Sequence, residues 1–287
     1  MSTVPSPTPT PAAFAIVVPK MDAAATAGLR VTQGRVIASE WLKFRTLRSS
    51  WILFVAAIGA VAMTGIALSW STIADWSHLH PGELDHLNPL ADSLVGFQLA
   101  QLFIGVLGII LIAGEYSTGM IRSSLGAVPK RLPVLWAKTL IVATLTFVTM
   151  LPASLFAFFV SQRILAGKNI QTSWSAAHVP RSVVGVALYL TVVAILGVGL
   201  GALIRNIAGA IATFVGVMLI LPGIASSLSQ VWADRINRFL PSTAGQSLLS
   251  FGSDTREMMP WNGFALFAVY ALGTILAAAF VLKGRDA

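Results

Sequence analysis

The sequence predicts an all-α membrane protein that crosses the bilayer six times. Only 10% of its 287 residues are charged, 56% are hydrophobic and the mean hydropathy is +0.80, whereas a soluble domain keeps about a quarter of its residues charged. Long uncharged stretches recur along the chain, each near the roughly 20 residues that a helix needs to cross the hydrocarbon core. Strands of an outer-membrane barrel would instead alternate apolar and polar residues over about 10 positions. The stretches are therefore predicted to be helices.

The six predicted spans occupy most of the chain. Their expected bounds are Trp51–Trp70, Leu94–Ala113, Leu140–Ser161, Ser182–Ile204, Ile207–Ser227 and Trp261–Leu282. Residues 1–12 are rich in Pro, Thr and Ser and carry no positive charge, which is typical of a disordered tail and not of a signal peptide. We expect such a tail over residues 1–30, on the cytoplasmic side, and one membrane domain over residues 31–287.

The basic residues predict the orientation. Thirteen Lys and Arg residues flank the spans on the side of the termini, and six lie on the other side. By the positive-inside rule, both termini are expected in the cytoplasm, in a multi-pass protein of the inner or plasma membrane. The net charge of +8 is then explained by the basic residues on the cytoplasmic side of the membrane and does not indicate nucleic-acid binding. The loop at 162–181 fits least well, since it places three basic residues outside.

Residues 35–50 are predicted to form an amphipathic helix on the cytoplasmic surface of the membrane. Ile37, Trp41 and Phe44 recur at helical spacing, and basic residues surround them, a pattern suited to the headgroup boundary. The helix is either an ordinary juxtamembrane anchor or a docking element for a cytoplasmic partner, with Glu40 pointing at that partner.

Spans 4 and 5 are joined only by Arg205 and Asn206, so a tight helical hairpin is expected. Gly197 and Gly201 near the end of span 4 have the spacing that lets membrane helices approach closely. They pack either inside the subunit or at a subunit interface.

Few residues inside the spans could carry chemistry. Span 2 alone holds strongly polar groups, and no span interior holds an ionisable side chain, which argues against an ion-coupled transporter. The sequence also shows no ring of charged residues of the kind that would indicate a channel. The chain also has no cysteine, no phosphate-binding loop and no hydrolase motif, so it is not expected to be an enzyme by itself. Candidates for a cavity or dimer interface are Phe97, Gln98, Gln101, Phe214 and Met218.

Three histidines in the first outer loop, His78, His80 and His86, lie close to Asp75 and other carboxylates. Imidazole and carboxylate together suit zinc, but short His-rich loops are more often solvated, so this is a weak metal candidate and no metal is predicted.

The most specific stretch is "GEYSTGMIRSSLGAVPKRLPVLWAK" at 114–138. It resembles the cytoplasmic loop of ABC type-2 exporter permeases, in which a glutamate after the second span precedes a glycine, a basic residue, a leucine, a proline and another basic residue. The matching positions are Glu115, Gly119, Arg122, Leu125, Pro129 and Arg131. Met120 departs from the threonine that the family often has.

Three further stretches resemble the same family in the same order. "VIASEWLKFRTLRSSW" is similar to its N-terminal interfacial helix, especially in actinobacterial members. "LGVGLGALIRNIAGAIA" is similar to its span 4–5 hairpin, and "LPSTAGQ" to its outer segment before span 6. The resemblance covers about residues 31–283.

The resemblance implies the permease subunit of an ATP-driven exporter. Such a subunit works as a homodimer or heterodimer with separate nucleotide-binding ATPase subunits, which hold the ATP and Mg; no cofactor is implied on this chain. The loops at 115–138 and 204–207, together with Glu40 and the helix around it, would receive the ATPase's motion. Glu115 is expected to serve coupling and not folding, with Arg122 one candidate partner.

Two other functions stay open. One is a channel or secondary transporter that needs no ATPase. The other is a membrane scaffold or immunity protein that transports nothing. The sequence does not name a substrate.

Overall fold

The computed structural model of the chain describes residues 32–78, 87–120, 132–249 and 258–284. Within these ranges the regular structure is helical, with no strand, and six segments are long and apolar enough to cross a membrane. The prediction of an all-α protein with six spans is therefore confirmed.

The first three spans follow a helix that lies before them, α2 (Gln33–Thr46). They consist of α3 (Arg48–Ala74), of α5 (Pro89–Leu94) with α6 (Phe97–Ser117), and of α8 (Leu132–Leu165) with a short 3-10 turn at Ala166–Lys168. The third span begins well before the expected Leu140. The uncharged stretch of the sequence begins only after Lys138, but the helix begins at Leu132 and includes that lysine, whose charge is paired with two glutamates.

The last three spans are α9 (Val179–Ile204), a broken fifth span and α14 (Pro260–Gly284). The fifth span consists of α10 (Ile207–Val215), a π turn at Gly216–Ile220 and α11 (Leu221–Ser226). Between the fifth and sixth spans lie α12 (Gln230–Asn237), α13 (Pro241–Gln246) and a 3-10 turn at Ser247–Leu249. The π turn ends two residues before Pro222, which lacks a backbone N–H and therefore disturbs the regular hydrogen bonding of this helix.

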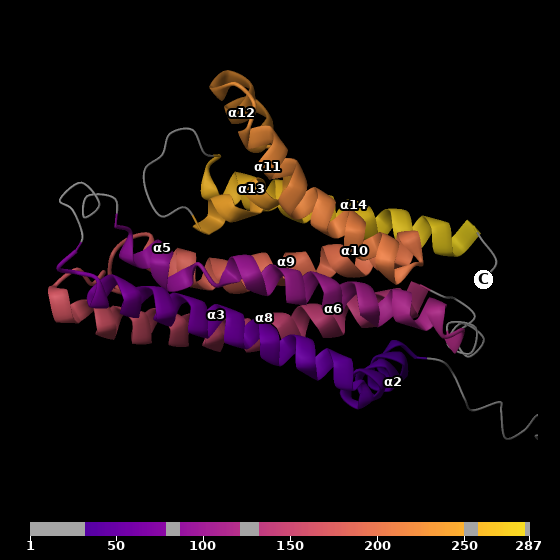
Figure 1. Ribbon diagram of the computed structural model, residues 1–287. Helices are drawn as coiled ribbons and strands as arrows, with labels where there is room; N and C mark the ends of the chain where they lie inside the picture. Colours follow the sequence, from indigo (N-terminus) through magenta and orange to yellow (C-terminus); the bar gives the residue numbers. More distant parts are fainter. Residues whose placement is uncertain (1–31, 79–86, 121–131, 250–257, 285–287) are drawn as a thin grey trace, which may run out of the picture. The chain divides into compact units, whose positions relative to one another are not determined.

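Successive spans run in opposite directions, and the segments that connect them gather at two opposite ends of the bundle (Figure 1). We call the end that holds α2, the start of α8 and the turn between α9 and α10 the α2 end. The opposite end, which holds α5, α12 and α13, is called the α13 end.

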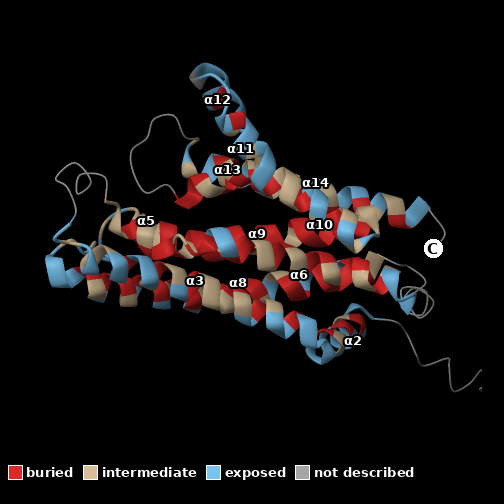
Figure 2. Cartoon of the chain, in the orientation of Figure 1, coloured by how far each residue is buried: buried red, intermediate tan, exposed pale blue. Residues whose placement is uncertain are grey.

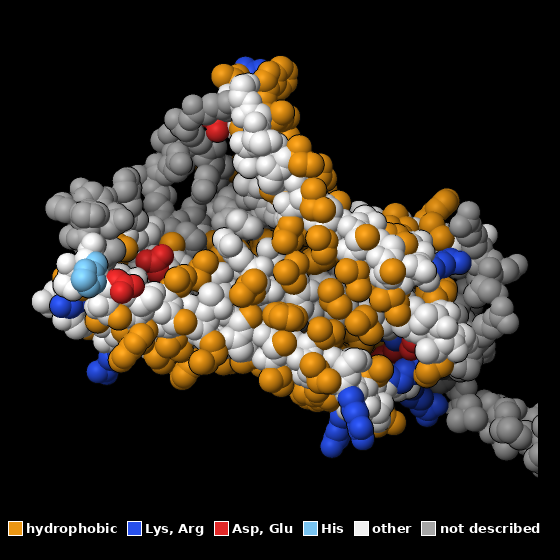
Figure 3. All heavy atoms as spheres, viewed as in Figure 1, with side chains coloured by type: hydrophobic (Ala, Val, Ile, Leu, Met, Phe, Trp, Pro, Cys, Tyr) orange, Lys and Arg blue, Asp and Glu red, His pale blue; other side chains and the backbone are white. Residues whose placement is uncertain are grey.

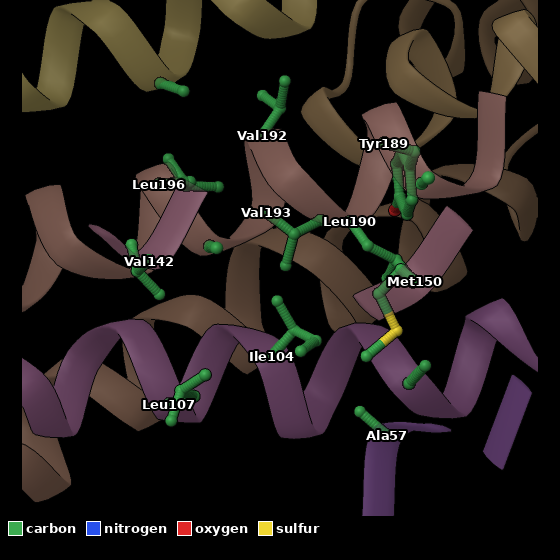
Figure 4. Close-up of a cluster of buried hydrophobic side chains, with 14 of the residues drawn as sticks. Ala57, Ile104, Leu107, Val142, Met150, Tyr189, Leu190, Val192, Val193 and Leu196 are labelled. Carbon is green, nitrogen blue, oxygen red and sulfur yellow. The ribbon is translucent and has the colours of Figure 1, made fainter. Parts of the chain in front are cut away.

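The centre of the bundle is α9, the most deeply buried span, which packs on α6, α8 and α14 (Figure 2). Apolar side chains from α6, α8 and α9 fill the space between these helices (Figure 4). Gly197 faces the backbone of Gly105, and Gly201 faces the backbone of Ile109 at 2.9 Å from an ideal Cβ position. These glycines of α9 therefore pack inside the subunit, against α6, and not at a subunit interface.

Candidate functional site

Four ionisable side chains from three helices meet at the α2 end of the bundle. Glu40 and Lys43 belong to α2, Glu115 to the last turns of α6, and Lys138 to the second turn of α8. We call these four residues the charge quartet.

Each lysine of the charge quartet contacts both glutamates. Lys138 Nζ lies 2.6 Å from Glu40 Oε2 and 2.8 Å from Glu115 Oε1. Lys43 Nζ lies 2.6 Å from Glu40 Oε1 and 3.2 Å from Glu115 Oε1. The two positive and two negative charges cancel, which is what a group of charges withdrawn from water requires.

Three of the four side chains are almost fully buried. Glu40 is 4% exposed, Lys138 5% and Glu115 8%, whereas the Lys43 side chain is 28% exposed. Burial alone would lower the pKa of Lys43, but its hydrogen bond to Glu40 and the nearby charge of Glu115 outweigh that effect and raise the pKa above the usual lysine value. Lys43 is therefore held in its charged form.

The spacing of α2 explains why Glu40 faces inward. Val36, Glu40 and Phe44 follow one another at intervals of four residues, lie on one face of the helix and are all buried. Val36 packs with Val134 of α8, while Phe44 meets the ring of Phe54 on α3 edge-on. Apolar contacts at both ends of this face thus fix the position of the carboxylate between them.

Two expectations about the glutamates are corrected by these contacts. Glu40 does not point at a cytoplasmic partner, because it turns into the subunit and binds Lys138. Glu115 is buried and contacts lysines of two other helices, so it contributes to holding three helices together, whereas its expected role in coupling stays a prediction. Its partners are Lys43 and Lys138, whereas the candidate partner Arg122 lies outside the described residues.

Sequence reasoning missed Lys138 as a member of this site. The residue ended the most specific motif and stood just before the predicted third span. The sequence did contain a signal for Lys138. A buried glutamate at a membrane boundary, such as Glu115, requires a nearby cation, and Lys138 is the lysine nearest to the predicted third span.

The other predicted coupling residues fall into two groups. Leu125, Pro129 and Arg131 lie outside the described residues, as does Arg122. Gly119 is described, and its φ of +72° shows the left-handed backbone that glycine adopts without strain; it follows the end of α6, as expected for a bend.

The turn between α9 and α10 is a second point of contact with the end of α6. Arg205 has a left-handed backbone with φ of +58° and ends α9. Its guanidinium lies 5.1 Å from the centre of the Tyr116 ring on α6. Asn206 caps α10, because its side-chain oxygen accepts a hydrogen bond of 2.8 Å from the Gly209 N–H. The expected tight hairpin is therefore present and touches the residue next to Glu115.

Four of the five candidates for a cavity or dimer interface are buried inside the subunit. Phe97, Gln101, Phe214 and Met218 are each at most 4% exposed, and the Tyr189 hydroxyl donates a hydrogen bond of 2.6 Å to Gln101 Oε1. As core residues they do not form part of the outer surface of the single subunit. Gln98 alone is exposed.

The weak metal candidate is only partly described. His78 follows the end of α3, whereas His80 and His86 fall outside the described residues. Among the residues that the structure does describe, no group of three or more His, Asp or Glu side chains could hold a metal ion.

Comparison with known proteins identifies one family. A family model described as "ABC-2 family transporter protein" matches residues 36–222, a range that contains the whole charge quartet, the first four spans and most of the fifth. No curated protein and no solved structure matches the chain.

Proposed function

The chain belongs to the ABC-2 family of transporter proteins, and from this premise we propose that it exports a substrate from the cytoplasm using ATP hydrolysed by a separate nucleotide-binding subunit. Membership of the family makes it the multi-pass permease subunit of an ABC transporter. The direction of transport, the ATPase partner and the pairing with a second permease subunit are parts of the proposal.

The α2 end is the proposed cytoplasmic end. Thirteen of the 19 basic residues flank the spans on this side in the sequence, and the loop at 71–93 on the other side has no Lys or Arg but contains four acidic residues. In Figure 3 the Lys and Arg side chains gather mainly at the α2 end. This distribution supports cytoplasmic termini, an orientation that would put the charge quartet within reach of a cytoplasmic ATPase.

The observation that carries the proposal is the charge quartet itself. A permease without its own ATPase must receive work through its cytoplasmic surface, and the elements that receive it must move as one. Displacing α2 from α6 and α8 would leave buried charges without partners, at a cost of about 3–5 kcal/mol. The quartet therefore fastens α2 to both helices that flank the proposed docking loop at 115–138.

Pairing with a second permease subunit is supported by the fifth span. Only 17% of its most apolar window is buried in the single chain. Gly216 and Gly223 on this span have nothing within 4 Å of an ideal Cβ position, so a neighbouring helix could approach them closely. We propose that a second permease subunit, identical or different, covers this face, while ATP and Mg bind the ATPase subunits.

The test combines the chain with an ATP-binding-cassette ATPase, sought first among the neighbouring reading frames. We expect the two to co-purify, and we expect the permease to raise the ATPase turnover; an ATPase variant without its Walker lysine is the control. Transport by the chain alone would support a channel or secondary transporter instead. An ATPase turnover that the chain leaves unchanged would support a scaffold.

A further inference from the structure

A cavity of about 550 Å³ opens beside the charge quartet at the α2 end. Its walls come from α2, the start of α3, the last turns of α6 and the first residue of α10. The volume is in the range of small-molecule sites.

The lining of the cavity has an apolar part and a polar part. Leu47, Ile110, Leu111 and Ile207 contribute hydrophobic surface, while the polar part includes Lys43, Arg48, the carboxylate of Glu115 and the hydroxyls of Ser117 and Thr118. A ligand that suits both parts is amphiphilic, with a polar head and an apolar chain.

The place of the cavity in the spans indicates where this ligand comes from. Arg48 is the first residue of the first span, Ser117 the last residue of the second and Ile207 the first residue of the fifth. The cavity thus lies where three spans end on the same side of the bundle, which is the depth of the lipid headgroups.

The charges favour an anion. Lys138 already contacts both glutamates of the charge quartet at short distance. Lys43, whose 3.2 Å contact with Glu115 is the longest in the quartet, is the partly exposed lysine. Arg48 adds a further positive charge on an exposed side chain. The quartet is neutral, so Arg48 gives the cavity and the quartet together a net positive charge.

We propose that the cavity binds an anionic phospholipid of the surrounding membrane. The phosphate lies between Lys43 and Arg48, and the acyl chains extend along the apolar wall formed by Ile110, Leu111 and Ile207. The lipid thereby holds the corner between α2 and α3 against α6, next to the charge quartet. This inference does not depend on the direction of transport or on the ATPase partner.

Native mass spectrometry of the full-length chain in detergent tests the proposal, with phosphatidylglycerol and phosphatidylcholine of identical acyl chains as probes. We expect phosphatidylglycerol to be retained more strongly. Arg48→Gln should weaken its binding about fivefold, the usual contribution of one basic residue near an anionic lipid. Arg45→Gln is the matched control, because Arg45 is exposed on α2 and does not line the cavity.

A second pair of variants tests the cavity without changing a charge. Gly114 lines the cavity, and a Cβ there would meet only one side-chain atom, at 3.7 Å, so Gly114→Leu should fill the space and lower phosphatidylglycerol binding severalfold. Gly59 of α3 has nothing within 4 Å of its ideal Cβ position and lies outside the cavity, so Gly59→Leu should leave binding unchanged.

Four results would overturn the proposal. They are equal retention of both lipids, equal losses in Arg48→Gln and Arg45→Gln, and undiminished binding in Gly114→Leu. The fourth is cross-linking between Thr118→Cys residues of two copies, which would assign the cavity to a second subunit. Inorganic phosphate is added in a separate titration: displacement of the lipid at equal concentration would indicate a site for free phosphate, whereas no displacement supports the lipid.

Discussion

Lys138 of α8 and Glu40 of α2 form an ion pair of 2.6 Å in which both side chains are at least 95% buried. The two residues are almost a hundred positions apart in the sequence, and Glu115 joins them from a third helix. A buried pair of this kind is a weak source of net stability, but the removal of one partner leaves the other charge uncompensated. The pair therefore makes the attachment of α2 sensitive to single substitutions.

Lys138→Met should destabilise the protein strongly. It leaves two buried glutamates with Lys43 alone, and breaking such a pair costs about 3–5 kcal/mol. Thermal unfolding in detergent, followed by tryptophan fluorescence, would show a lower unfolding temperature. Lys283→Met is the matched control, because Lys283 is exposed at the end of α14.

The double variant Lys138→Met/Glu115→Gln distinguishes loss of charge balance from loss of packing. The double variant removes one charge of each sign, so part of the stability lost in Lys138→Met should return. The interaction free energy between the two sites, obtained from a double-mutant cycle, should be about 0.5–3 kcal/mol. If Lys138→Met unfolds at the same temperature as Lys283→Met, the quartet does not hold the helices.

Glu115→Gln should uncouple the permease more than it unfolds it. Lys138 keeps its 2.6 Å contact with Glu40 in this variant, so α2 stays attached and expression and dimerisation should persist. The link from α6 to the two lysines is weakened, so we expect a reduced transport-stimulated ATP turnover in the complex. Asp75→Asn, at an exposed position beyond α3, should keep normal turnover; normal turnover in Glu115→Gln as well would contradict a coupling role.

The spans could be predicted from the sequence because the bilayer imposes a length and an apolar composition on each one. The sequence offered a signal for Lys138 as a partner of Glu115, but the full set of contacts in the charge quartet could not be predicted, since these contacts depend on how helices are rotated about their axes. Lys43 and Glu115 are 72 positions apart, and Lys138 and Glu115 are 23 apart. The apolar face of α2 is visible as a pattern in the sequence, but the inward direction of Glu40 within that face follows only from its contacts with Lys43 and Lys138.

Gly197→Ala should be costly because α9 and α6 pack backbone to backbone at this point. An added Cβ would collide with the carbonyl oxygen of Gly105, and backbone atoms cannot move aside without separating the helices. Overpacking of this kind costs about 1–3 kcal/mol, which thermal unfolding in detergent would detect. Gly59→Ala has open space and should not be destabilising; equal effects of the two substitutions would contradict the packing of α9 on α6.

Single cysteines test the proposed orientation, because the chain has no native cysteine. Substitutions at Ser77, Thr172 and Ser253 should react with an impermeant maleimide in intact cells, while Ser124→Cys should react only after the membrane is opened. The reason is the excess of basic residues on the side of the termini. Labelling at Ser124 without labelling at Ser77 would invert the topology.

Disulfide cross-linking to the ATPase subunit tests whether the chain docks an ATPase through the loop at 115–138. Cysteines at Ser123 or Ser124, within the proposed docking loop, should cross-link to cysteines on the ATPase surface, and the yield should change when nucleotide is added. A cysteine at Asn206 should cross-link more weakly, because its turn is shorter and reaches less far. We expect nucleotide-dependent cross-links from Ser123 or Ser124 and none from Ser77; cross-links from the 71–93 loop alone, or an ATPase that does not co-purify with the chain, would contradict docking through this loop.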